Sequence, residues 1–359
     1  MINRPLPAKN RVLAAFSHQE PDRVPLDYSA NPGIDHRLKK HFGLSPADNE
    51  GLLQCLGVDF RYVWAPYIGP RLHNDFSDRT VDLWGIHRRW IEHESGGYWD
   101  YCDFPLRDAT LEIATSWPMP SPDDFDYDIL AKTCQLHSEY CVVAGNAGVG
   151  DIINSTGMIR TMEQVLVDLI SDDPIGMVYI DRKLEIMLAV TERILDAGRH
   201  WIDIFFMGED LGTQIGPMLS KPLFRKQLRP RLSKFVDLAK SYGLPVMFHS
   251  CGSSSWAFND FIEMGVDIID TLQPEAANMA PSYLKANFGK QLSYHGCIST
   301  GGPVAYGTLG EVVDNVRETL QVMMPRGGYA LAPSHALQDN SPTENVLAMY
   351  QAAKDFGSY

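Results

Sequence analysis

The segment His249-Ser250-Cys251-Gly252 holds the residues of this chain that are best suited to chemistry. It follows the apolar run 244–248, which predicts a short buried strand. Side chains two residues apart at the end of a strand point the same way, so His249 and Cys251 should face one site. Imidazole and thiolate are ligands that suit zinc, and Gly252 allows a sharp turn beside them. The alternative is a buried histidine and a buried free thiol that bind no metal.

His335 offers a third ligand. It follows the segment 327–333, in which a glycine turn leads into an apolar run that predicts another short strand. If both strands are parallel members of one barrel, His335 lies on the same rim as His249 and Cys251, where barrel enzymes collect their catalytic residues. The alternative is a loop histidine that caps a neighbouring backbone group.

Strands and helices alternate along most of the chain, which predicts right-handed βαβ units and a parallel sheet. Strands are predicted at 24–28, 141–147, 201–208, 245–249, 267–270, 291–295 and 328–332. Long helices are predicted at 174–197, 221–242, 309–324 and 343–356. At 359 residues this number of repeats favours an α/β fold in the form of a closed (β/α)8 TIM barrel. We expect a single domain over 1–359, with an N-terminal decorated region and extra hairpins around 60–112.

The composition excludes several classes of function. A net charge of −14 argues against nucleic-acid binding and against docking on an anionic membrane. No apolar run reaches the length of a membrane span, and residues 1–5 lack the apolar core of a signal peptide. The six cysteines are spread thinly, as in proteins with free thiols from a reducing compartment. These features predict a soluble cytoplasmic protein.

Other polar residues lie where predicted strands end. Glu209 and Asp210 follow the strand at 201–208, and either could act as a general acid or orient a substrate; helix capping or a structural salt bridge is the alternative. Further candidates for substrate binding, each with plain packing or a turn as the alternative, are Tyr28, Gln273, Glu275 and Cys297.

Taken in order, several short segments carry a family resemblance. They are Asp22-Arg23-Val24-Pro25, Asp82-Leu83-Trp84-Gly85, residues 208–214, His249-Ser250-Cys251-Gly252, Gly265-Val266-Asp267, Gln273-Pro274-Glu275, Gly327-Gly328-Tyr329 and Pro333-Ser334-His335. On these segments the chain resembles the uroporphyrinogen decarboxylase superfamily, and within it the zinc-dependent, cobalamin-linked methyltransferases. The resemblance covers nearly the whole chain and implies a distorted TIM barrel. It also implies that a carboxylate near Gln273 and Glu275 belongs to the metal site.

Two departures from the family pattern bear on the substrate. Uroporphyrinogen decarboxylases carry an arginine-rich segment after the first strand, but here residues 27–33 contain no arginine and the next one is Arg37. This argues against a substrate with many carboxylates. The thiol-methylating relatives have a cysteine where this chain has His335. One thiolate and two imidazoles would leave zinc with a net charge of plus one, which makes a stronger Lewis acid.

The sequence therefore predicts a zinc enzyme that demethylates a small methylated compound, by preference an O-methyl compound such as a methyl ether. The acceptor would be the corrinoid (cobalamin) of a partner protein, because nothing in this chain resembles a corrinoid-binding domain. Two alternatives stay open: a decarboxylase of the uroporphyrinogen type or of another carboxylic acid, and a non-catalytic protein that binds a metal or a corrinoid. Homodimer formation is also left open.

Overall fold

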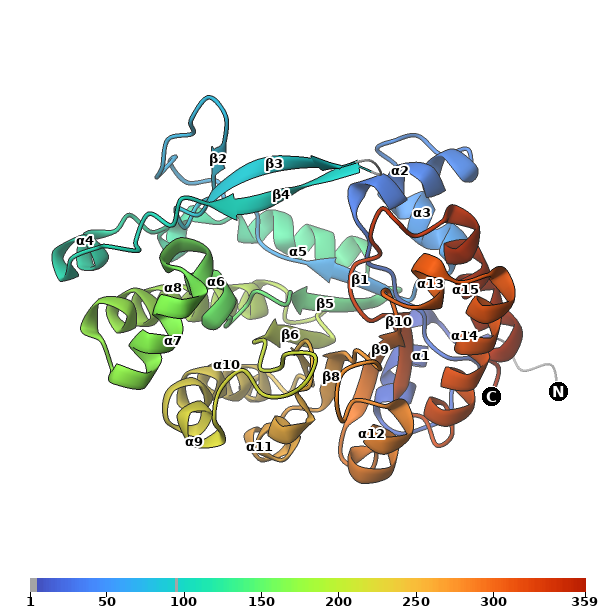
Figure 1. Cartoon of the computed structure of the whole chain (residues 1–359). Helices are drawn as coiled ribbons and strands as arrows, with labels where there is room; N and C mark the ends of the chain where they lie inside the picture. Colours follow the sequence, from blue (N-terminus) through green and yellow to red (C-terminus); the bar gives the residue numbers. More distant parts are fainter. Residues whose placement is uncertain (1–4, 94–95) are drawn as a thin grey trace.

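A curled parallel sheet forms the centre of the molecule. Within residues 5–93 and 96–359, which the computed structural model describes, this sheet has seven strands, arranged in the order in which they occur in the chain. They are β1 (Phe60–Val63), β5 (Cys141–Gly145), β6 (Ile204–Gly208), β7 (Val246–His249), β8 (Ile268–Thr271), β9 (Ser293–Ile298) and β10 (Tyr329–Pro333). Figure 1 shows helices packed around the outside of this sheet. The predicted distorted TIM barrel is confirmed.

An extended segment at Leu26 lies between the two edge strands. Leu26 pairs in parallel with Leu331 of β10, and its carbonyl accepts a hydrogen bond from the N–H of Asp59, directly before β1. The strand predicted at 24–28 is therefore present only as an isolated bridge. Pro25 has no N–H to donate, and the N–H of Leu26 donates to the Asp59 side chain at 2.9 Å, so a regular ladder cannot form.

Most of the helices lie around the outside of the central sheet. The N-terminal ones are α1 (Ala8–Phe16), α2 (Pro32–His41), α3 (Asn49–Leu56), α4 (Leu111–Ser116), α5 (Tyr127–Leu136), α6 (Ile153–Arg160), α7 (Met162–Ser171) and α8 (Pro174–Ala197). The others are α9 (Lys221–Leu223), α10 (Arg229–Ser241), α11 (Phe258–Met264), α12 (Pro281–Phe288), α13 (Pro303–Tyr306), α14 (Leu309–Met323) and α15 (Thr343–Phe356). None of the helices in the described ranges is long and apolar enough to cross a bilayer.

The helix predicted at 221–242 is divided in the structure. A π-helical turn, Phe224–Leu228, separates α9 from α10. Pro230 lies in the first turn of α10 and cannot donate a backbone hydrogen bond into the preceding turn. The missing donor explains why the regular α-helical pattern is interrupted at this point.

Residues 60–112 contribute to both sheets of the molecule. After β1, the strands β2 (Thr80–Val81), β3 (His87–His93) and β4 (Gly96–Cys102) pair antiparallel, and in the described part of the chain they make up a separate sheet. Figure 1 shows this sheet above β1 and α5 as drawn. Trp90 and Trp99 pair across β3 and β4 and remain about half exposed.

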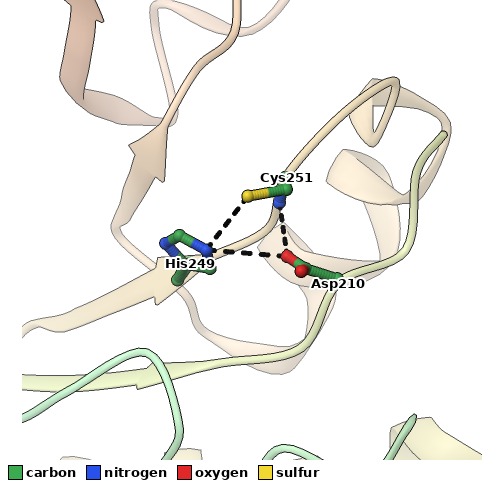
Figure 2. Close-up of side chains that lie close together, drawn as sticks. All are labelled: Asp210, His249 and Cys251. Atoms are coloured by element: carbon green, nitrogen blue, oxygen red, sulfur yellow. Dashed lines mark hydrogen bonds and ion pairs between the residues drawn. The ribbon is translucent and has the colours of Figure 1, made fainter. Parts of the chain in front are cut away.

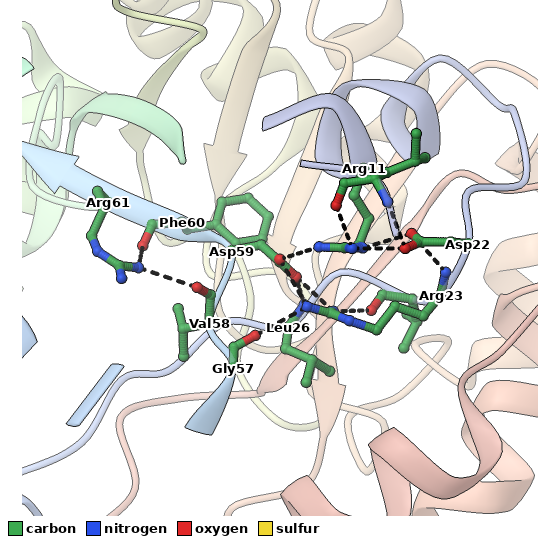
Figure 3. A network of polar contacts seen from close by, with 11 residues as sticks. Arg11, Asp22, Arg23, Leu26, Gly57, Val58, Asp59, Phe60 and Arg61 are labelled. Atoms are coloured by element: carbon green, nitrogen blue, oxygen red, sulfur yellow. Dashed lines mark hydrogen bonds and ion pairs between the residues drawn. The ribbon is translucent and has the colours of Figure 1, made fainter. Parts of the chain in front are cut away.

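A buried carboxylate joins the N-terminal segments to the start of β1 (Figure 3). Asp59, which is 1% exposed, accepts hydrogen bonds from Arg11 and Arg23 at 2.7 Å and from the N–H of Leu26. Arg11 also forms an ion pair with Asp22 at 2.7 Å. The side chain of Asp59 therefore links both helix α1 and the Leu26 segment to the start of β1.

We expect Asp59→Ala to destabilise the protein by about 3 kcal/mol, because it leaves two guanidinium groups without their buried partner. Urea unfolding followed by circular dichroism measures this change. Asp123→Ala removes the partner of Arg193 in an exposed ion pair and should leave the unfolding midpoint unchanged. Equal midpoints for the Asp59 variant and wild type would contradict the assigned role of the network.

Candidate functional site

Three potential metal ligands meet where β6 and β7 end. Gly208 of β6 lies beside His249 of β7 in the sheet, so the residues that follow each strand are also neighbours. The ligand atoms of Asp210, His249 and Cys251 all lie within 4.8 Å of one another (Figure 2). Nε2 of His249 is 3.3 Å from Sγ of Cys251 and 3.5 Å from Oδ1 of Asp210. We call these three residues the ligand cluster.

Gly252 allows the two loops of the cluster to approach each other. Its φ of +68° lies in the left-handed region, and a Cβ at this position would lie 2.4 Å from the carbonyl oxygen of Gly212. The N–H of Ser253 then donates to the carbonyl of Thr213 at 2.8 Å and links the loops. The sharp turn predicted at Gly252 is confirmed.

The carboxylates of Asp210 and Glu209 have different surroundings. Oδ1 of Asp210 accepts from the N–H of Cys251 at 2.7 Å, and its Oδ2 accepts from the amide of Asn154 at 2.7 Å. Glu209 is buried and accepts from the N–H groups of Ile152 and Ile153 at the start of α6. Burial and the nearby Asp151 raise the pKa of Glu209 well above its usual value. Asp210 thus belongs to the ligand cluster, whereas Glu209 anchors α6.

A buried chain of alternating acids and histidines supports His249. Nδ1 of His249 contacts Asp270 of β8 at 2.6 Å, and the other carboxylate oxygen of Asp270 contacts Nδ1 of His295 of β9 at 2.5 Å. Nε2 of His295 then contacts Asp27 at 2.9 Å. His249, Asp270 and His295 are paired residues on adjacent strands, so the register of the sheet aligns them. Because Nδ1 of His249 is held by Asp270, Nε2 is the nitrogen left for a metal.

Charges within this row of acids and histidines shift the pKa values of its members. Burial alone would raise the pKa of Asp270, but hydrogen bonds from His249 and His295 hold it well below the usual range. Burial alone would lower the pKa of His295, yet its bonds to Asp27 and Asp270 raise it to about 10. Similar contacts with Asp270 and Cys251 raise the pKa of His249 despite its burial. These contacts therefore favour the protonated form of both imidazoles.

A cavity of about 390 Å³ opens beside the ligand cluster. Its wall includes His249, Asp270 and His295, together with two residues that the sequence suggested, Tyr28 and His335. His335 is exposed, and its Nδ1 lies 3.4 Å from the carbonyl oxygen of Ala336. Among the described residues, His335 is not part of the group whose ligand atoms lie within 4.8 Å. It faces the same cavity as the cluster without joining it.

The remaining predicted residues lie around the site without lining this cavity, as far as the described residues define its wall. Oε1 of Gln273 accepts from the N–H of Gly252 at 2.7 Å and so supports the loop that carries Cys251. Glu275 is exposed. Cys297 is buried in β9, and burial raises the pKa of its thiol to about 12.

Sequence reasoning missed the acid–histidine chain. Asp270 and His295 each end a predicted strand, so the strand-end rule applied to His249 would also have selected them. Asp27 and Tyr62, whose hydroxyl donates to Asp27 at 2.5 Å, carry no such signal, because their role depends on the pairing of distant segments.

Comparisons with known proteins place the chain in a family. The sequence model described as uroporphyrinogen decarboxylase (URO-D) matches residues 130–356. The chain belongs to this family. The matched range includes all three residues of the ligand cluster and β5 to β10. A search of curated proteins found no match.

Three solved structures resemble this URO-D family member to different degrees. A methyltransferase from Methanosarcina mazei superposes with a TM-score of 0.65 at 18% identity, covering 98% of this chain and 99% of that one. The 3-keto-D-glucoside 4-epimerase YcjR from E. coli gives a TM-score of 0.37 at 15% identity, over 64% of this chain and 86% of its own. The IolI protein with a bound zinc atom gives a TM-score of 0.35 at 14% identity, over 70% of this chain and 93% of its own.

We expect Asp270→Asn to weaken zinc binding by roughly tenfold to a hundredfold, because the neutral amide no longer stabilises the positive charge that metal binding places on His249. Competition with a chromophoric chelator measures the zinc affinity. Asp237→Asn, an exposed substitution on α10, is the matched control and should leave the affinity unchanged. An unchanged affinity in the Asp270 variant would show that Asp270 does not support a metal ligand.

Proposed function

We propose that this URO-D family member is a zinc-dependent methyltransferase. It would demethylate a small methylated substrate, preferably an O-methyl compound, and pass the methyl group to the corrinoid of a partner protein. The observation that carries the proposal is the ligand cluster of Asp210, His249 and Cys251 at the carboxyl ends of β6 and β7, beside the cavity that His249 lines. The name of the M. mazei structure, a methyltransferase with the same fold, is consistent with it.

The donor atoms of the cluster suit zinc. A catalytic zinc site has three protein ligands, drawn from imidazole, thiolate and carboxylate, and one open position. The cluster supplies one of each, with Nε2 of His249 oriented by Asp270. His335 faces the same cavity, and we retain it as a further ligand that could approach the cluster.

The inclusion of Asp210 changes the charge balance expected from the sequence. Cys251 and Asp210 together carry two negative charges, which would balance Zn²⁺, whereas His249, Cys251 and His335 alone would leave one positive charge. A carboxylate is a harder, less electron-donating ligand than the second thiolate of the thiol-methylating relatives. The proposed site therefore keeps more Lewis acidity than theirs, which favours an oxygen leaving group.

The wall of the cavity argues against a substrate with many carboxylates. Of the described residues that line it, none is arginine or lysine. Arg37, the first arginine after residues 27–33, donates instead to the carbonyls of Asp339 and Ser341 at 2.9 Å. A porphyrinogen would lack guanidinium and ammonium partners here, whereas a small neutral ether would need none.

The proposed reaction breaks one bond to carbon and forms another. The methyl carbon leaves oxygen and bonds to cobalt(I), which supplies both electrons of the new bond. The electron pair of the broken C–O bond stays on the oxygen, which takes up a proton. When bound, zinc would supply the Lewis acidity that makes this oxygen a better leaving group. In this proposal Asp210 serves as a metal ligand, and Glu209 positions α6 beside it.

We expect about one zinc ion per chain after purification without chelator, and much less in Cys251→Ser, since a hydroxyl is a poor zinc ligand. Elemental analysis of both proteins measures this. Cys55→Ser, on the exposed face of α3, is the matched control and should keep its zinc. Zinc that is equal in wild type and the Cys251 variant, or absent from both, would refute the site.

Two further variants identify the third ligand. Asp210→Asn should lower the zinc affinity more than His335→Ala if the ligand cluster is the metal site, because only Asp210 already lies within 4.8 Å of its partners. His200→Ala, in the exposed turn after α8, is the control for His335. Loss of zinc from His335→Ala with full retention in Asp210→Asn would instead support the set predicted from the sequence.

We expect the zinc-loaded protein to transfer methyl groups from small methyl ethers to cob(I)alamin. The appearance of methylcobalamin absorbance measures this reaction, and Cys251→Ser should abolish it. Failure with a panel of methyl ethers and methylamines, together with metal-independent release of carbon dioxide from a carboxylic acid, would favour a decarboxylase. Binding of metal or corrinoid without either reaction would favour a non-catalytic binding protein.

A further inference from the structure

A second cavity, of about 300 Å³, lies next to the metal-site cavity. It is bounded by residues that follow β1 and β5, by the segment before β3 and by α8. The two cavities share Asn146, which follows β5. The walls of the second cavity are mainly apolar and include Trp64, Trp84, Phe125, Met158 and Met187. A volume of this size suits a ligand of about one ring.

Lys183 of α8 places a buried ammonium group on this wall. The residue is only 4% exposed, and its Nζ lies 5.4 Å from the centroid of the Trp84 ring. It forms no hydrogen bond or ion pair with any residue in the described ranges 5–93 and 96–359. An ammonium group has three donors, and burying it without an acceptor is costly. Burial lowers the pKa of Lys183, whereas the charges of Asp151 and Asp82 oppose this and favour the ammonium form. Because Lys183 lines the cavity, a ligand that enters it can supply an acceptor.

The carboxylates of Asp82 and Asp151, which also line this cavity, have donors of their own. Oδ1 of Asp82 accepts from the N–H groups of Trp84 and Ile86, and its Oδ2 lies 3.4 Å from Arg88. Asp151 accepts from two backbone N–H groups at the start of α6, at 2.9 and 3.2 Å. Burial raises the pKa of Asp151 to about 6, and the nearby charge of Lys183 opposes this rise. Neither carboxylate forms an ion pair with Lys183.

We propose that this second cavity binds a small aromatic monocarboxylate, whose carboxylate meets Lys183 and whose ring contacts the aromatic and methionine side chains. A carboxylate offers the charged acceptor that Lys183 lacks, and the hydrogen bond is strengthened by low solvent access. Aromatic and sulfur-containing walls favour a flat ring over other apolar groups. Arg88 adds a second cation to the same wall.

The site is distinct from the proposed metal centre. The metal-site cavity has no lysine or arginine among its described lining residues, whereas the second cavity has both. The two sites can therefore be tested independently. The aromatic-acid site needs no metal, so binding can be measured on the metal-free protein.

Isothermal titration calorimetry with benzoate, on metal-free full-length protein in excess chelator, tests the proposal. Benzoate should bind saturably, and benzyl alcohol and benzylamine should bind at least tenfold more weakly, because charge-assisted hydrogen bonds contribute about ten- to a hundredfold in affinity. Hexanoate should also bind more weakly than benzoate. Absence of saturable benzoate binding, or equal binding of benzylamine or hexanoate, would overturn the proposal.

Variants locate the binding site. Lys183→Met keeps the length and the apolar stem of the side chain, and it should weaken benzoate binding by roughly tenfold to a hundredfold while leaving benzyl alcohol unaffected. Lys132→Met, on the exposed face of α5, is the matched control. His249→Ala should retain benzoate binding, which separates this site from the metal-site cavity. The assignment would be overturned by unchanged benzoate binding in a Lys183→Met protein with a native melting temperature, or by loss of binding in His249→Ala. If Lys183→Met lowers the melting temperature, Arg88→Gln is used in its place and should weaken benzoate binding. Unchanged benzoate binding in Arg88→Gln would then overturn the assignment.

Discussion

The position of Asp270 between two imidazoles is the constraint on which the site depends. Strands β7, β8 and β9 are parallel and paired so that His249, Asp270 and His295 lie at one level of the barrel. A shift of one residue in either pairing would turn a member of this row to the other face of the sheet. The orientation of His249, and hence the nitrogen that it can offer to a metal, is therefore determined by sheet register.

The same row connects the site to the closure of the barrel. His295 contacts Asp27, which follows Leu26, the residue that pairs with β10 and bonds to the backbone before β1. Buried charges are tolerated here because acids and bases alternate and each polar atom has a partner. Removal of one member would leave its neighbours charged and unpaired, so a substitution at Asp27 would also disturb the metal-binding end of the row.

Local patterns were sufficient to predict much of the fold and part of the site. Apolar runs identified β6 and β7, and the spacing of His249 and Cys251 identified two members of the ligand cluster. The position of Asp210 within reach of these two ligands was not predictable, because it depends on Gly208 and His249 being neighbours in the sheet. The irregular segment at Leu26 and the π-helical turn were not predicted. They depend on tertiary contacts and on single prolines, which the periodicity of apolar residues does not reveal.

Barrel closure at Leu26 and Leu331 also constrains the order of folding. The two residues that meet are separated by most of the sequence, and contacts between distant segments form late because loop closure costs entropy. During synthesis, the Leu26 segment can bond to β10 only after residue 331 has left the ribosome. Until then Asp59, Arg11 and Arg23 can already associate, since all three are made early. The network of Arg11, Arg23 and Asp59 would therefore hold the Leu26 segment beside β1 before β10 is available to pair with it.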